Sequence, residues 1–145
     1  MNTLQRITQT GNTNLAIALL RIWIGAMMVY HGFVKLFPPS PDGMMFNPWK
    51  FITTLSTERG IPEFFGWCAI LAEFLGGLCL VTGFLTRPAA LFVIITMLVA
   101  VFNIHMHDPW GKKEFALAYL VSALAFVVSG GGMYSIDARL SKRSE

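Results

Sequence analysis

The stretch FFGWCAILAEFLGGLCLVTGF, residues 64–84, decides the fold of this protein. A helix needs about 20 apolar residues to cross the hydrocarbon core of a bilayer, and this stretch is long enough. It carries a single charge, Glu73, near its middle. Because a charged side chain at the centre of a spanning helix costs about 2.5–3.5 kcal/mol to insert, we expect Glu73 to face the inside of a helix bundle.

Three more apolar segments accompany this stretch, at residues 15–34, 88–104 and 115–133. The segment that starts at Pro88 is the shortest, and proline suits the first turn of a helix, where a missing N–H is tolerated. Only Leu85, Thr86 and Arg87 separate it from residues 64–84, so these two helices must be antiparallel neighbours. The pattern predicts an all-α membrane protein, a four-transmembrane-helix bundle that forms a single domain over residues 1–145.

The composition agrees with a protein that is solvated mostly by lipid. Charged residues make up 13% of the chain and hydrophobic residues 54%, whereas a soluble domain carries about 25% charged residues. The net charge of +3 is not gathered into a basic stripe with interleaved aromatic residues, which excludes a nucleic-acid-binding surface. The lipid bilayer is therefore the first partner that we expect.

The long connection between the first two spans predicts a short helix. Helix breakers first end the preceding span: Pro38, Pro39, Pro41 and Gly43. Asn47 can then cap a helix that has Pro48 at its first position and ends near Gly60. Its apolar residues gather on one side: Trp49, Phe51, Ile52 and Leu55. We expect this helix to lie in the membrane interface, with a lid over a site as the alternative.

Four spans place both ends of the chain on one side of the membrane. The basic residues outside the spans are divided almost evenly between the two sides, so the positive-inside rule decides little. The basic cluster behind the fourth span, Arg139, Lys142 and Arg143, favours cytoplasmic termini.

Two opposite charges lie inside the first two spans, Arg21 and Glu73. We predict that they pair, because the two helices are neighbours in a small bundle. Helical spacing puts Arg21, Gly25, Met28, Gly32 and Lys35 on one face of the first helix, and Gly66, Glu73, Gly77 and Leu80 on one face of the second. Glycines on such faces let two backbones approach closely. The pair is then either an ion pair that fixes the register or a substrate or proton site.

A second polar group gathers at the other ends of these helices. It consists of His31, Lys35, His105, His107, Asp108 and Glu114. We expect a pocket there for a small polar head group such as that of a quinone, with walls from Trp49, Phe51 and Trp110. Histidine titrates near neutral pH and can exchange protons with such a ligand. A solvated cluster of helix-end residues is the alternative.

A metal site is a weaker interpretation of the same group. It would use His31, either His105 or His107, and Glu114. The spacing of these residues matches no recognised metal-binding signature. We therefore expect no metal.

Several spaced motifs resemble those of the DoxX family. They are Leu20-Arg21, Tyr30-His31-Gly32, Lys35-Leu36, Glu73 ahead of Gly76-Gly77, GFLTRPAA at 83–90 and GGGMYSID at 130–137. In the family the last run usually reads Gly-Pro-Gly before a Ser-x-Asp ending, whereas Gly131 replaces the proline here and Met133 follows Gly132. The resemblance covers nearly the whole chain.

The resemblance implies a four-helix protein of the bacterial inner membrane, similar to the membrane subunits of thiosulfate:quinone oxidoreductase. The family's polar positions then fall on Arg21, His31, Lys35, Glu73, Arg87, His105 and Glu114. We assign quinone or substrate binding, or proton relay, to Arg21, His31, Lys35, Glu73, His105 and Glu114, and a structural role to Arg87 and Asp137.

We accordingly expect an integral membrane subunit of a redox system that binds quinone or a small substrate; whether it is an enzyme by itself stays open. The sequence has no haem ligand pair, flavin fingerprint or CxxC motif, so we expect no tightly bound cofactor. Electrons would then come from a protein partner or be carried by quinone itself. The alternatives are a non-catalytic membrane scaffold and a small-molecule binding or transport protein, and transport by so short a chain would need a homo-oligomer.

Overall fold

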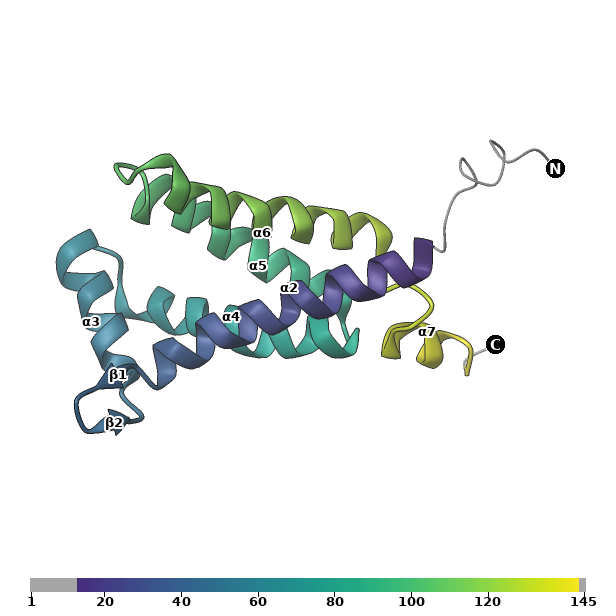
Figure 1. Cartoon of the computed structure of the whole chain (residues 1–145), viewed down its shortest axis with the longest axis horizontal. Helices are drawn as coiled ribbons and strands as arrows, with labels where there is room; N and C mark the ends of the chain where they lie inside the picture. The colour runs from purple at the N-terminus through teal and green to yellow at the C-terminus, as the bar shows by residue number, and fades with distance from the viewer. Residues whose placement is uncertain (1–12, 144–145) are drawn as a thin grey trace.

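The computed structural model describes residues 13–143, and it consists of helices with one two-stranded hairpin (Figure 1). In chain order the elements are α2 Thr13–Leu36, β1 Pro39–Ser40, β2 Gly43–Met44, α3 Pro48–Arg59, α4 Glu63–Thr82, α5 Thr86–Val99, the π-helical η1 Ala100–Ile104, α6 Trp110–Ser129 and α7 Ile136–Ser141. The hairpin, the π-helical segment and α7 were not predicted from the sequence.

Three of the described helices are long and apolar enough to cross a membrane: α2, α4, and α5 continued by η1. This confirms the predicted all-α membrane protein. The helix α6 has 20 residues but is less apolar, because Lys112, Lys113 and Glu114 all lie near its start. The crossing of the membrane by α6, and with it the count of four spans, stays a prediction.

The long helices pack in the order α2, α4, α5, α6. The helix α4 lies against both α2 and α5, α6 packs along α5, and α2 touches α6 over a much smaller area. The core between them is apolar and buried, with Met28, Leu80, Val93 and Phe126 among its members. As predicted, α4 and α5 are adjacent antiparallel helices joined by a tight turn (Figure 1).

The helices α2 and α4 approach so closely that glycine is required on both. A Cβ atom placed on Gly25 would lie 2.7 Å from the backbone nitrogen of Val81, and one on Gly77 would lie 2.7 Å from the backbone nitrogen of Val29. Gly32 faces the backbone of α4 in the same way. Because lipid gives no hydrophobic drive for two helices to associate, such close packing is a main source of their affinity.

The faces predicted for this contact are confirmed. The residues Arg21, Gly25, Met28 and Gly32 of α2 are buried. The residues Gly66, Glu73, Gly77 and Leu80 of α4 are buried as well.

At one end of the bundle the C-terminal segment folds back onto the turn between α4 and α5. The Asp137 carboxylate accepts hydrogen bonds from the backbone N–H groups of Leu85 (2.8 Å) and Thr86 (2.9 Å). The backbone N–H of Asp137 donates to the carbonyl of Gly83 at 2.9 Å. Asp137 therefore caps the first turn of α5, where N–H groups have no partner within the helix.

Arg21 joins α2 to this junction. Its side chain is 1% exposed, and its guanidinium donates to the carbonyls of Leu80, Val81 (2.9 Å) and Tyr134 (3.1 Å). One side chain thus connects α2, the end of α4 and the segment before α7. Removing it would take this donor from the carbonyls of Val81 and Tyr134, whereas the Leu80 carbonyl would keep the backbone N–H of Gly83. A buried carbonyl without a donor is costly.

The predicted ends of two spans were wrong by a few residues. The helix α4 ends at Thr82 and not at residue 84, because Gly83 adopts a left-handed conformation (φ 70°). The helix α6 ends at Ser129 and not at residue 133, because Gly130 leaves the helical conformation (φ 67°, ψ −162°).

The short helix predicted in the long connection is confirmed as α3, and a left-handed Gly60 ends it as expected. The side chain of Asn47 makes no capping hydrogen bond, which corrects that part of the prediction. Ile52 and Leu55 are buried, and Trp49, although 52% exposed, meets the Trp67 ring of α4 edge to face with the two centroids 5.6 Å apart. The helix α3 thus docks on α4 through the predicted face, with Ile52 against Gly66.

We predict that Gly77→Ala lowers the melting temperature of the protein in detergent, while Gly76→Ala at the next position does not. A methyl group on residue 77 would meet backbone atoms of α2, and overpacking of this kind costs about 1–3 kcal/mol. A Cβ atom on Gly76 would have its nearest neighbours at 3.8 Å, an ordinary contact. Equal melting temperatures for the two variants would contradict the close approach of the helices.

Candidate functional site

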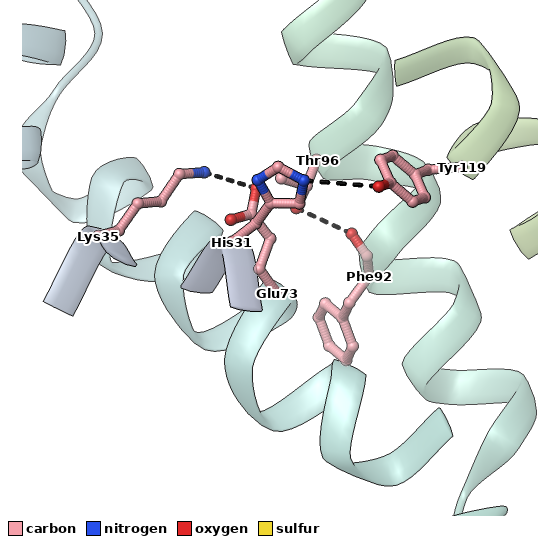
Figure 2. Close-up of polar contacts among 6 residues, drawn as sticks. All are labelled: His31, Lys35, Glu73, Phe92, Thr96 and Tyr119. Carbon is pink, nitrogen blue, oxygen red and sulfur yellow. Dashed lines mark hydrogen bonds and ion pairs between the residues drawn. The ribbon is translucent and has the colours of Figure 1, made fainter. Parts of the chain in front are cut away.

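The candidate site is built around a buried carboxylate at the other end of the contact between α2 and α4. Lys35, in the last turn of α2, places its Nζ atom 2.5 Å from Oε1 of Glu73, in the middle of α4 (Figure 2). Glu73 is 3% exposed. Its second oxygen, Oε2, is buried and has no hydrogen-bond partner within the described part of the chain. We call this pair of side chains the Lys35–Glu73 site.

The short helix α3 contributes to the site. The ring of Phe51 lies 4.5 Å from the Lys35 Nζ atom, a cation–π contact. Ile52, the next residue, anchors α3 on α4 against Gly66. The helix thus fixes the position of the lysine, whose side chain is 24% exposed.

One turn before Lys35 on α2, His31 reaches towards α6. Its Nε2 atom lies 3.5 Å from the hydroxyl oxygen of Tyr119, and the two rings meet edge to face with their centroids 5.7 Å apart. Figure 2 shows the His31 ring in projection between the ion pair and Tyr119. The Glu73 carboxylate lies within electrostatic reach of the Tyr119 hydroxyl. Four groups that can hold or move a proton therefore lie on the neighbouring helices α2, α4 and α6: Lys35, Glu73, His31 and Tyr119.

The predicted pairing of Arg21 with Glu73 is wrong. Arg21 and Lys35 are about 20 Å apart along α2 at a rise of 1.5 Å per residue. Because α4 runs antiparallel to α2, Arg21 meets the C-terminal end of α4 while Lys35 meets its middle. The sequence indicated that Arg21 and Glu73 are both buried. It did not indicate how far α2 is shifted along α4, and this register decides which cation meets Glu73.

The polar residues predicted at one level of the membrane form two separate groups. Lys35 and His31 belong to the site above, whereas His105 binds Asp108 through its Nδ1 atom at 2.7 Å. This hydrogen bond lowers the pKa of Asp108, and Lys112, 3.6 Å away, acts in the same direction. Among the described residues, no hydrogen bond or ion pair links His105 to Lys35 or Glu73.

The remaining predicted residues lie apart from the site. Glu114 and His107 are exposed. Trp110 is exposed as well. Of the expected pocket walls, Phe51 touches a site residue, Lys35. Arg87 donates to the carbonyl of Val128 at 3.4 Å, between α5 and α6. Within residues 13–143, no three His, Cys, Asp or Glu side chains form a group that could hold a metal ion.

Tyr119 is the site residue that we did not predict. It lies in α6 and contacts His31 across the small contact between α2 and α6. Its hydroxyl group within an otherwise apolar segment is the signal that could have identified it, because a buried tyrosine hydroxyl usually finds a polar partner.

We predict that Lys35→Gln and Glu73→Gln are coupled in their effect on stability, whereas Arg21→Gln and Glu73→Gln are additive. Removing one member of a buried ion pair leaves the other charge unpaired, and removing both relieves that state, so the coupling should be about 0.5–3 kcal/mol. Arg21 shares no partner with Glu73. The measurement is the free energy of unfolding in detergent for the single and double variants. Coupling between Arg21 and Glu73 would contradict the observed register.

Comparisons with known proteins identify the family. The family model described as DoxX matches residues 16–106. Inner membrane protein YqjF of Escherichia coli K12 is 38% identical over 88 residues, which cover 58% of this chain and 68% of YqjF. A protein of Haemophilus influenzae named "Uncharacterized protein" is 28% identical over 139 residues, 88% of this chain and 92% of its own length.

A more distant relative is the Bacillus subtilis protein named "Putative oxidoreductase CatD", which is 22% identical over 120 residues, 82% of each chain. No solved structure matches this chain. The family match covers more than half of the chain and includes Arg21, Lys35 and Glu73. With its apolar helices and this match, the chain is a membrane protein that belongs to the DoxX family.

Proposed function

We propose that this protein is a subunit of a redox system in the bacterial inner membrane, and that it binds the polar head group of a quinone, or of a similar small substrate, at the Lys35–Glu73 site. The observation that carries the proposal is the Oε2 atom of Glu73, which is buried and has no partner among the described residues. The other oxygen of the carboxylate, Oε1, is paired with Lys35. Buried polar atoms nearly always have a partner, and an unsatisfied one costs about 1–3 kcal/mol. A ligand hydroxyl would supply the missing donor.

The two charges of the site suit both forms of a quinone. The Lys35 ammonium can donate a hydrogen bond to a quinone carbonyl, and the Glu73 carboxylate can accept one from the hydroxyl of the reduced form. Reduction of a quinone takes up two electrons and two protons. Lys35 and Glu73 can supply or receive the protons, and His31 with Tyr119 lies next to them as a further proton-holding pair.

The electrons need a separate source, for which we propose a protein partner that carries redox centres. We propose that this partner binds the protein at the membrane. The name of the Bacillus subtilis relative supports a redox role. The protein would thus provide a membrane-embedded site where protons and a lipid-soluble substrate meet, while the partner provides the oxidant or reductant.

The placement in the membrane follows from the helices and the relatives. A bacterial inner membrane is supported by the Escherichia coli relative and by the three apolar helices. We propose that α6 is the fourth span, since it packs along α5 and carries no charged residue after Glu114. We further propose that α3 lies in the interface and that both termini are cytoplasmic, because basic residues follow the C-terminal end of α6.

We predict that Glu73→Gln weakens the binding of a short-chain quinone analogue about 10–100-fold. Glutamine keeps the shape of the side chain and the packing of α4, but it removes the charge, and a hydrogen bond to a charged group is worth about 1.5–3 kcal/mol. The measurement is a spectral titration of the purified protein in detergent. Lys35→Gln should weaken binding as well.

The matched control is Glu63→Gln, because Glu63 is an exposed residue in the first turn of the same helix. This variant should bind the analogue like the unchanged protein. Unchanged affinity in both Glu73→Gln and Lys35→Gln would contradict the proposed site. Absence of binding to the unchanged protein would contradict the quinone and favour a scaffold role.

A further inference from the structure

The C-terminal helix α7 has a face that the proposed redox function does not use. An open hollow of about 450 Å³ is lined by three residues of α7 and by one residue just after its end: Ile136, Arg139 and Leu140, and then Arg143. The side chain of Leu140 is 49% exposed. Two arginines and two large aliphatic side chains thus line one hollow, an amphipathic arrangement typical of membrane surfaces.

The hollow is held at the level where the membrane-crossing helices end. Asp137, inside α7, binds the first N–H groups of α5 and the carbonyl of Gly83 at the end of α4. Both α4 and α5 are long and apolar enough to cross the membrane, so their shared turn marks the membrane surface. Figure 1 shows α7 at this end of the bundle. This position does not depend on whether α6 also crosses.

The basic side chains of this face are available for an anion. Within the described residues, the side chains of Arg139, Lys142 and Arg143 take part in no hydrogen bond or ion pair. The carboxylate within α7, that of Asp137, is already bound to two backbone N–H groups. Within the described residues the three basic side chains therefore have no carboxylate partner.

We infer that the hollow on α7 binds an anionic phospholipid. Guanidinium groups bind phosphate oxygens through paired hydrogen bonds, which suits Arg139 and Arg143 to a lipid phosphate. Ile136 and Leu140 line the same hollow and offer an apolar surface to the acyl chains. Both kinds of contact are available together because Asp137 fixes the helix at the membrane surface. A free phosphate would use the arginines but not the aliphatic residues.

The experiment measures the retention of phosphatidylglycerol by the full-length protein in detergent, with native mass spectrometry as the readout. We expect the unchanged protein to bind phosphatidylglycerol in preference to phosphatidylcholine. The double variant Arg139→Gln/Arg143→Gln should lose about thirtyfold in affinity, since each basic residue near a membrane surface contributes about a factor of five. Both arginines are exposed, so the substitutions should leave the fold intact.

The matched control is Lys50→Gln/Arg59→Gln, which removes the same charge from exposed positions on α3. This variant should retain phosphatidylglycerol. Equal loss in both double variants would overturn the site, because it would show a general effect of net charge. Competition by inorganic phosphate at a similar concentration would show that the site binds a free anion, and would also overturn the lipid assignment.

Discussion

The contact of α2 with α4 through glycine backbones determines the rest of the structure. Gly25 and Gly77 each lie where a Cβ atom would meet the backbone of the opposite helix. Such a contact allows one register only, because a shift along the helix would bring larger side chains between the backbones. The register in turn decides that Arg21 meets the carbonyl groups at the end of α4 and that Lys35 meets Glu73.

The two ends of this contact use buried charge in different ways. At one end the guanidinium of Arg21 is bound by backbone carbonyls of two segments, and its role is to hold α2 to the junction. At the other end Glu73 is paired with Lys35 through one oxygen, and its other oxygen has no partner among the described residues. Arg21 also keeps one buried atom, Nε, without a partner among the described residues, so the difference between the two ends lies in their neighbours. Glu73 is paired with Lys35, one turn from the contact of His31 with Tyr119, and these side chains can exchange protons with a ligand. We therefore place the function at this end.

Much of the fold could be predicted from the sequence because lipid imposes strong patterns. The apolar segments identified the long helices, and Pro48 with Gly60 marked the limits of α3. The buried faces of α2 and α4 followed from helical spacing. The partner of Glu73 could not be predicted, since the choice between Arg21 and Lys35 depends on register. Tyr119 was missed because it lies on a helix far from His31 in sequence and meets it only through tertiary packing.

The cap on α5 has a consequence for the order in which the protein assembles. The N–H groups at the start of α5 receive their acceptor from Asp137, more than fifty residues further along the chain. During synthesis from the N-terminus, α5 is therefore complete before its cap exists. The junction can close only after α6 and the glycine-rich segment behind it have left the ribosome. Tyr134, whose carbonyl binds Arg21 of α2, is also made after all four long helices, so the bundle reaches its final form only after these helices have been synthesised.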